Sequence, residues 1–354
     1  MNNSKNKKDL LGKGSYGCII RPNFSCNKYN TTTKYISKLG NKEYILSEMK
    51  TINALGIDKI PNFNKYVLVP LEICDLNKSF INKKVLEKDI RNCIIKLPSY
   101  TKNATVSNII QEYGGISYQD YKKNNKTLED NIPYIYQLLQ SIKFLNDNGI
   151  VHRDIKDNNM VIDIKRKLAR IIDFGFGMFS NEINNLYNTN NILIGSIEVY
   201  GSGYEIWPME LYIFSNFYKG DDLIKISKSV FMNYYNSYIA FFPKEDIKTF
   251  KKHIDKELLE INKKVTQINN SSNKDKLIFE WKNESNNKLD VFSFGKFLLG
   301  EIQVLHSTNE KLVNDFKKFI YEKLLIMNSY KRVDIDKCIK LFTNICKVHK
   351  VSFN

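Results

Sequence analysis

The run His152-Arg153-Asp154-Ile155-Lys156-Asp157-Asn158-Asn159 decides the fold. It places a carboxylate at Asp154, an ammonium group at Lys156 and a carboxamide at Asn159. A carboxylate can take a proton from a hydroxyl, an ammonium group can neutralise a phosphoryl group, and an amide oxygen can bind a hard cation. This combination at this spacing favours a phosphoryl-transfer loop over an ordinary polar loop.

A second motif follows 19 residues after Asp154. The apolar pair Ile171-Ile172 leads into Asp173-Phe174-Gly175, and the separation suits a strand, a hairpin and a second strand. We expect Asp173 to bind a magnesium ion that bridges phosphates, and Phe174 to pack into the core and hold that aspartate in place.

A glycine pattern, G-x-G-x-x-G, lies near the N-terminus. Its missing side chains let backbone amides approach phosphate oxygens closely. Strand-like residues Cys18-Ile19-Ile20 follow it, whereas a dinucleotide-binding fold needs a helix there. The pattern therefore predicts a strand-turn-strand flap over ATP. The flap residues are Leu11, Gly12, Lys13, Gly14, Ser15, Tyr16, Gly17, Cys18 and Ile19.

Lys38 ends the next strand-like run, and a helix with apolar residues at helical spacing is predicted from about Lys42 to Leu55. A carboxylate on that helix would position the Lys38 ammonium group, and Glu43 and Glu48 are the candidates. We choose Glu48 because Ile52 and Leu55 lie four and seven residues after it, so that its face points inward.

Together these motifs resemble the protein kinase superfamily, from about Asp9 to Phe342. Gln111-Glu112-Tyr113-Gly114 resembles the hinge whose backbone binds adenine, with Gln111 as gatekeeper, and Asp290 opens a segment similar to the buried helix that anchors the catalytic loop. The resemblance implies ATP bound through the flap and a small set of further residues. These are Lys38, Glu48, Glu112 and Gly114 for ATP, Asn159 and Asp173 for Mg²⁺, and Asp154 with Lys156 for catalysis. It also implies protein substrates, and Lys156 favours serine and threonine as acceptors.

The chain departs from the family pattern after the catalytic motifs. Trp207-Pro208-Met209-Glu210 stands where A-P-E is expected, so we expect Glu210 to pair with Arg332 through a one-residue shift. Ile36 replaces the usual alanine two residues before the lysine, which predicts a tighter nucleotide pocket. An insert at about 212–285 contains an amphipathic helix, Asp246 to Ile268. The residue patterns of several segments resemble those of serine/threonine kinases of large nucleocytoplasmic DNA viruses.

The segment between Asp173 and Glu210 carries several hydroxyl groups that a kinase could phosphorylate, and Arg153 could receive such a phosphate. The candidates are Ser180, Tyr187, Thr189 and Ser196, and the sequence leaves the choice among them open. Gly201-Ser202 resembles the pair that supports peptide docking.

The predicted architecture is an α+β, two-lobed fold. A polar tail, 1–8, precedes a small antiparallel β lobe with one main helix, 9–114, and a larger, mainly helical lobe, 115–354. Strands are predicted at Tyr66–Val69 and Ser107–Tyr113, and a helix is predicted to end at Asn148-Gly149.

Composition favours a soluble enzyme. No apolar run approaches 18 residues and the start is polar, so we expect neither a membrane span nor a secretory signal. The net charge of +16 accompanies many Lys, Asn, Ile, Tyr and Phe residues, as an AT-rich genome would encode, so nucleic acid is an unlikely partner. The six cysteines are scattered, which predicts reduced thiols and a cytoplasmic location, or the virion if the protein is viral. The four histidines are scattered too, so we expect no structural metal site.

Two other functions fit parts of this pattern. A pseudokinase scaffold would lack one of Lys38, Asp154 and Asp173, but the chain has all three. A small-molecule phosphotransferase on the same fold would usually lack Arg153, Lys156 and the Gly201-Ser202 pair. The sequence has no motif that defines an oligomeric state or a particular protein substrate.

Overall fold

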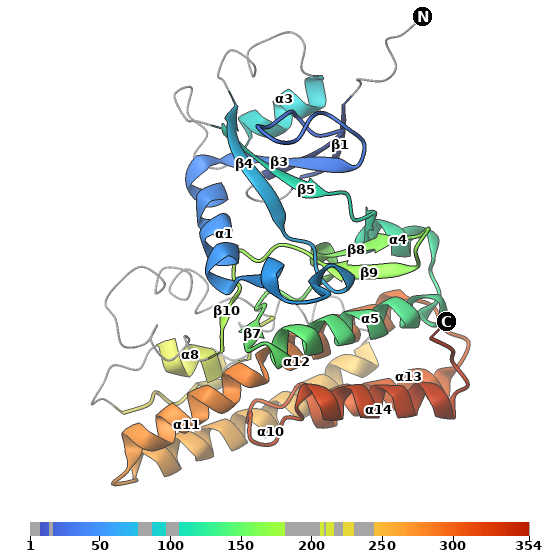
Figure 1. Cartoon of the computed structure of the whole chain (residues 1–354). Helices are drawn as coiled ribbons and strands as arrows, with labels where there is room; N and C mark the ends of the chain where they lie inside the picture. Colours follow the sequence, from blue (N-terminus) through green and yellow to red (C-terminus); the bar gives the residue numbers. More distant parts are fainter. Residues whose placement is uncertain are drawn as a thin grey trace, which may run out of the picture. The chain divides into compact units, whose positions relative to one another are not determined.

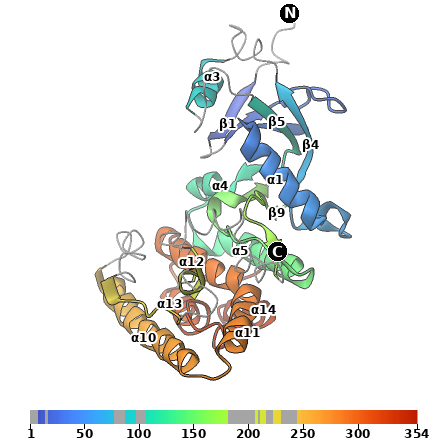
Figure 2. The ribbon, with the colours of Figure 1, turned by 90° about the vertical axis from the view of Figure 1, so that its left-hand side faces the viewer.

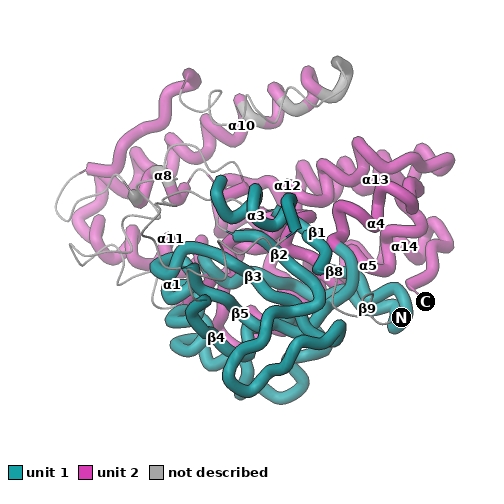
Figure 3. Tube along the Cα trace, turned by 90° about the horizontal axis from the view of Figure 1, so that it is seen from above, with its two compact units in different colours: residues 1–116, 161–176 teal, residues 117–160, 177–354 magenta. Residues whose placement is uncertain are grey.

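The computed structural model describes residues 8–13, 17–76, 87–96, 106–180, 206–208, 210–215, 222–229 and 244–353. The chain forms two compact units, one from residues 1–116 and 161–176 and the other from residues 117–160 and 177–354 (Figure 3). The first contains an antiparallel sheet and the second is mostly helical, which confirms the predicted α+β class. The sequence prediction divided the chain once, at Gly114, whereas residues 161–176 return to the first unit.

The first unit is a five-stranded antiparallel sheet with a helix on each face (Figures 1 and 2). Its strands, in the spatial order β1-β2-β3-β5-β4, are β1 (Asp9–Lys13), β2 (Gly17–Arg21), β3 (Tyr35–Asn41), β5 (Val106–Glu112) and β4 (Pro70–Leu76). Side chains alternate along β3, so Lys38 faces α1 (Lys42–Leu55) while Leu39 packs with α3 (Lys88–Ile95).

Local signals fix the bounds of α1, as the sequence predicted. The Asn41 side chain accepts a hydrogen bond from the Glu43 N–H and caps the first turn, and Gly56 ends the helix at φ +58°. Strand β5 lies where a strand was expected. The prediction of a strand at Tyr66–Val69 is wrong. Those residues pair instead with Ile171 of β9 (Leu168–Ile171), and the strand of the sheet, β4, begins at Pro70.

Short elements connect the two units in sequence. One unit boundary falls within β6 (Ile116–Ser117) and another within β8 (Met160–Asp163), after Met160, and β9 follows in the first unit. In the second unit, β7 (Ile150–Val151) pairs with β10 (Met178–Phe179). The helices of the second unit are α4 (Tyr118–Asn124), α5 (Leu128–Asp147), α8 (Glu210–Ser215), α10 (Lys244–Asn269), α11 (Lys274–Asn287), α12 (Leu289–Val304), α13 (Glu310–Phe319) and α14 (Ile335–Val348).

Helix α12 is the centre of the second unit's core. Nearly every residue of its first two turns is buried, and a Cβ atom on Gly295 would lie 2.7 Å from the Leu324 Cβ, so only glycine fits this contact. Helix α10 confirms the amphipathic pattern, since Ile261, Val265 and Ile268 are buried along one side. Among the described residues, no helix combines the length and apolar composition needed to cross a bilayer.

A buried ion pair joins the start of α8 to the segment that precedes α14. Arg332 Nη2 donates to Glu210 Oε1 at 2.9 Å, and both side chains are inaccessible to solvent. This contact confirms the expected one-residue shift. Burial raises the pKa of Glu210, and the neighbouring Arg332 charge opposes that rise. The Ser285 hydroxyl also donates to Glu210, a contact that the sequence analysis did not anticipate.

Four of the six cysteines form disulfides in the first unit. Cys18 of β2 bonds to Cys93 of α3, and Cys26 bonds to Cys74 of β4, with Cα separations of 6.1 and 5.8 Å. The expectation of reduced thiols is therefore wrong for these four, because the fold brings together cysteines 75 and 48 residues apart that no local spacing pattern reveals. The cytoplasmic location loses this support and stays a prediction.

We expect the Cys18–Cys93 bond to stabilise the first unit. A double Cys18→Ser/Cys93→Ser variant should lose about 4 kcal/mol of unfolding free energy, because the bond closes a long loop in the unfolded chain. Denaturant unfolding with and without dithiothreitol measures this, with Cys26→Ser/Cys74→Ser as the matched comparison. Mass spectrometry of unreduced digests should recover both linked peptide pairs. Alkylation of all six thiols in unreduced, denatured protein would contradict the pairing.

Removing one member of the buried ion pair should be costly. Arg332→Met leaves Glu210 without its cation, so we expect a loss of about 3–5 kcal/mol in unfolding free energy. The adjacent Lys331→Met is the control, because Lys331 is 60% exposed and pairs with a surface carboxylate, so its loss should cost less than about 1 kcal/mol. Urea denaturation measures both. Equal effects would show that burial of the pair does not matter.

Candidate active site

The first unit places an ammonium group between two carboxylates. Lys38 Nζ donates to Glu48 Oε2 at 2.6 Å and lies 3.6 Å from Asp173 Oδ2. The contact confirms Glu48 as the partner, whereas Glu43 lies exposed in the first turn of α1. Burial alone would lower the pKa of Lys38, but the charges of Asp173 and Glu48 outweigh it and raise the pKa. Lys38 is therefore held as a cation.

Asp173 is presented by a strained backbone. It follows β9 with φ +67°, a left-handed conformation that is uncommon for residues other than glycine and costs about 1 kcal/mol or more. Phe174 is completely buried, as predicted, while the Asp173 side chain is 41% exposed. The buried Phe174 thus anchors the backbone beside Asp173, while the Asp173 carboxylate stays accessible to solvent, as a group that binds a cation must be.

The flap strands pair as expected, with Lys13 opposite Cys18 and Ile19 opposite Lys38. Because directly paired residues share a face, Ile19 lies on the Lys38 side of the sheet. The Cys18 side chain lies on the opposite face in its disulfide, so only its backbone can serve the predicted ATP contact. Gly14, Ser15 and Tyr16 fall outside the described residues.

Gly17 is required by its surroundings. A Cβ atom there would lie 3.0 Å from the Leu39 carbonyl oxygen and 3.3 Å from Lys38 Cγ. The absence of a side chain on Gly17 leaves this space to the Lys38 side chain. Leu11, at the start of the flap, is 42% exposed.

The hinge segment also requires a glycine. A Cβ atom on Gly114 would lie 2.3 Å from Leu68 Cδ1 and 2.6 Å from Val161 Cγ2. The gatekeeper candidate Gln111 is buried and donates to the Leu68 carbonyl at 3.1 Å. The Glu112 carboxylate lies 3.7 Å from the buried Arg170, an arginine that the sequence analysis missed. The Glu112 side chain is thereby directed to β9.

In the second unit, Asp290 fixes the start of the catalytic loop. The His152 and Arg153 N–H groups donate to its two carboxylate oxygens at 2.7 and 2.9 Å. This confirms the predicted anchor. Burial raises the pKa of Asp290, and the charge and hydrogen bonds of the loop oppose that rise. Arg153 takes φ +68°, the second strained residue among the motifs.

The three residues predicted to act together converge on one carboxylate. Lys156 Nζ lies 2.9 Å from Asp154 Oδ2, and Asn159 Nδ2 donates to the same oxygen at 2.6 Å. Asn159 also donates to the Asp154 carbonyl at 2.9 Å. The loop therefore presents an oriented carboxylate beside a cation, with the Asn159 amide nitrogen committed and its oxygen left for other ligands.

Arg153 has close neighbours in the second unit. Its guanidinium lies 4.6 Å from the Trp207 ring centroid, and Trp207 Nε1 donates to the Arg153 carbonyl at 2.6 Å. Arg153 is 3% exposed. The candidate phosphorylation sites Tyr187, Thr189 and Ser196, and the Gly201-Ser202 pair, lie outside the described residues. Ser180 is described, at the end of β10.

Each unit presents a side-chain oxygen of the kind that a small hard cation prefers, on Asp173 in the first unit and on Asn159 in the second. Among the described residues, no group of three or more His, Cys, Asp or Glu side chains could hold a metal ion on its own.

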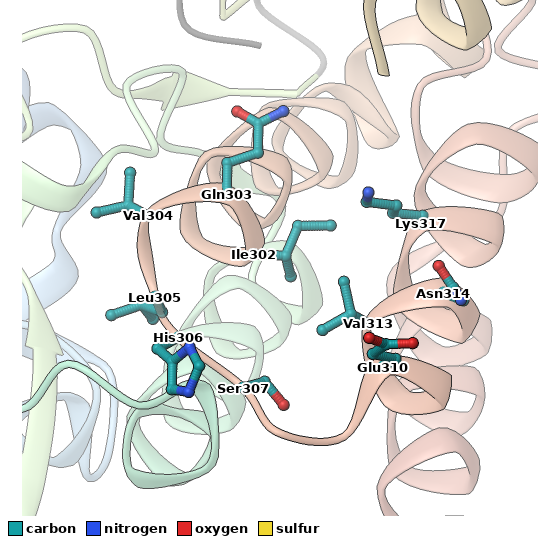
Figure 4. Close-up of a pocket in the computed structure, with 10 residues that line it drawn as sticks. All are labelled: Ile302, Gln303, Val304, Leu305, His306, Ser307, Glu310, Val313, Asn314 and Lys317. Atoms are coloured by element: carbon teal, nitrogen blue, oxygen red, sulfur yellow. The ribbon is translucent and has the colours of Figure 1, made fainter. Parts of the chain in front are cut away.

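A separate groove of about 490 Å³ lies in the second unit where α12 ends and α13 begins (Figure 4). Leu305, His306 and Val313 are among its lining residues, and the Ser307 hydroxyl at its edge already donates to Glu129. The described residues that line it include none of the predicted site residues. We therefore do not assign the groove a part in the chemistry.

The protein kinase domain family matches residues 5–342 of this chain. Serine/threonine-protein kinase 1 of African swine fever virus (isolate Pig/Kenya/KEN-50/1950) is 39% identical over 98 residues, which cover 27% of this chain and 33% of that protein. The yeast serine/threonine-protein kinase PKH2 is 24% identical over 180 residues, 50% of this chain and 14% of that protein. The Drosophila melanogaster ovarian-specific serine/threonine-protein kinase Lok is 23% identical over 221 residues, 58% of this chain and 41% of that protein.

The chain thus spans about a third of the length of the viral relatives that it matches, while the family match runs through almost all of the chain. Both catalytic motifs and the Lys38–Glu48 pair lie inside the matched range. The chain belongs to the protein kinase family.

Proposed function

We propose that this protein transfers the γ-phosphoryl group of ATP to serine and threonine hydroxyls of proteins, with Mg²⁺. One observation carries the proposal: the Asp154 carboxylate is held by Asn159 and Lys156 on a loop that Asp290 anchors. Such a carboxylate can orient a hydroxyl and accept its proton. The serine/threonine relatives and the position of Lys156 support the choice of acceptor.

The groups of the first unit bind the nucleotide in this proposal. Lys38, kept charged by Glu48 and Asp173, neutralises the phosphates, and the flap backbone around Gly17 lies against them. The backbone of Glu112 and Gly114 meets the adenine ring, beside the buried Gln111. Ile36 of β3 stands where the family usually has alanine, and its larger side chain would narrow the nucleotide pocket.

The groups of the second unit act on the acceptor. As a bond forms between the acceptor oxygen and the γ-phosphorus, the bond from that phosphorus to the bridging oxygen breaks and ADP leaves. Asp154 takes the hydroxyl proton, and Lys156 neutralises charge on the transferring group. Bound Mg²⁺ supplies neutralisation of phosphate charge, and Asp173 and Asn159 are the residues that would hold it.

The decisive experiment replaces the proton acceptor. Asp154→Asn should lower the phosphorylation rate at least about 100-fold, because the general base is lost. Binding of a fluorescent ATP analogue should remain within twofold of wild type, since Asp154 belongs to the acceptor side. Wild-type activity should disappear with EDTA and return with added MgCl₂. Phosphoamino-acid analysis should find phosphoserine or phosphothreonine, and equal signal from wild type and variant would refute catalysis and favour a nucleotide-binding scaffold.

The Lys38 pair offers a second test with an internal control. Glu48→Gln removes the charge that positions Lys38, so the KM for ATP should rise roughly tenfold, the value of a lost charge-assisted hydrogen bond. Glu43→Gln, on the exposed first turn of the same helix, should leave the KM unchanged. Steady-state kinetics with varied ATP measure both. A larger effect at Glu43 would overturn the assignment.

A further inference from the structure

Lys122 of α4 links the catalytic loop to the core helix α12. Its Nζ donates to Asp157 Oδ2 at 2.9 Å and to Glu301 Oε1 at 2.6 Å. Asp157 belongs to the loop, Glu301 belongs to α12, and the three positions are far apart in sequence. Nothing in the loop pattern around Asp154 identifies Lys122.

The link is built into the interior. The Glu301 side chain is 4% exposed, and the completely buried Tyr118 donates its hydroxyl to the other Glu301 oxygen at 3.1 Å. Lys122 itself is 14% exposed. Burial would lower the pKa of Lys122, but the charge of Glu301 and the hydrogen bonds to Glu301 and Asp157 raise it. The ammonium group therefore stays charged between two carboxylates.

Such an arrangement contributes little net stability, because removing charges from water offsets most of their attraction. Its effect is on geometry. Without Lys122 no cation would lie between the carboxylates of Glu301, which is 4% exposed, and Asp157, which is 26% exposed, and the loop would lose this link to α12.

Asp157 begins the short helical turn Asp157–Asn159. The Asn159 N–H donates to the Lys156 carbonyl at 3.0 Å, and the Asn159 side chain then reaches Asp154. A shift at Asp157 would therefore change the orientation of the Asp154 carboxylate.

Helix α12 thus holds the loop at two points. Asp290, in its first turn, binds the start of the loop directly, and Glu301, 11 residues later, holds the end of the loop through Lys122. A rigid helix separates these two residues by about 16 Å along its axis. The loop is consequently held by one helix at two positions.

We infer that Lys122 is a positioning residue for catalysis: it fixes the Asp157–Asn159 turn and thereby sets Asn159 against Asp154. This inference rests on the proposed kinase function. Lys122 touches none of the groups assigned to ATP. Its loss should therefore lower kcat and leave the KM for ATP unchanged.

The test compares neighbouring lysines. Lys122→Met should lower kcat about 10- to 100-fold, because small misplacements of catalytic groups have effects of this size, with the KM for ATP within twofold of wild type. Lys122→Arg, which keeps the cation, should recover most of the loss. Lys123→Met is the matched control, because Lys123 is 65% exposed and its one ion pair among the described residues is with Asp120 of its own helix. It should behave as wild type.

Asp157→Asn keeps the Lys122–Glu301 contact and weakens only the connection to the loop. It should lower kcat as Lys122→Met does, with a melting temperature close to wild type. If Lys122→Met and Asp157→Asn lower only the melting temperature or the folded fraction, with wild-type kcat per folded molecule, the positioning role is refuted.

Asp154→Asn, assayed in parallel, separates this inference from the proposed function. Loss of activity in Asp154→Asn with wild-type kcat in Lys122→Met would overturn the positioning role alone. Wild-type signal in Asp154→Asn would overturn the proposed function, and with it the basis of this inference.

Discussion

The buried carboxylate of Asp290 is the constraint on which the catalytic loop depends. It accepts hydrogen bonds from two successive backbone N–H groups, those of His152 and Arg153. Both hydrogen bonds can form only if the chain turns sharply at these residues. The positive φ of Arg153 is the local cost of that turn. Because burial destabilises the charged carboxylate and the loop amides stabilise it, loop and helix hold each other in place.

Ion pairs between different elements repeat the same principle in each unit. Lys38–Glu48 joins β3 to α1, Glu210–Arg332 joins α8 to the segment before α14, and Lys122 joins α4 to the loop and α12. Pairs of this kind add little net stability, but leaving one partner uncompensated is costly. We infer that they select one geometry among several compact ones, which is what a phosphoryl-transfer site requires.

The first unit is reinforced from the face opposite Lys38. There α3 packs its apolar side on β2 and is bonded to it through Cys18–Cys93, while Cys26–Cys74 ties the loop after β2 to β4. The face of the sheet that carries Lys38 thus keeps glycines and charged groups, and covalent and apolar contacts stabilise the sheet from the opposite face. Alternation along the strands separates these two roles.

The sequence by itself determined the local features. Capping residues and apolar spacing set α1, and the order of residues in the loop and at Asp173 defined the chemistry and the family. Only the tertiary structure decided where β4 lies, which cysteines pair, and that Lys122 and Ser285 matter. The reason is that helix caps and periodicity act over a few residues, whereas these contacts join positions from 30 to 179 residues apart and exist only once the chain has folded.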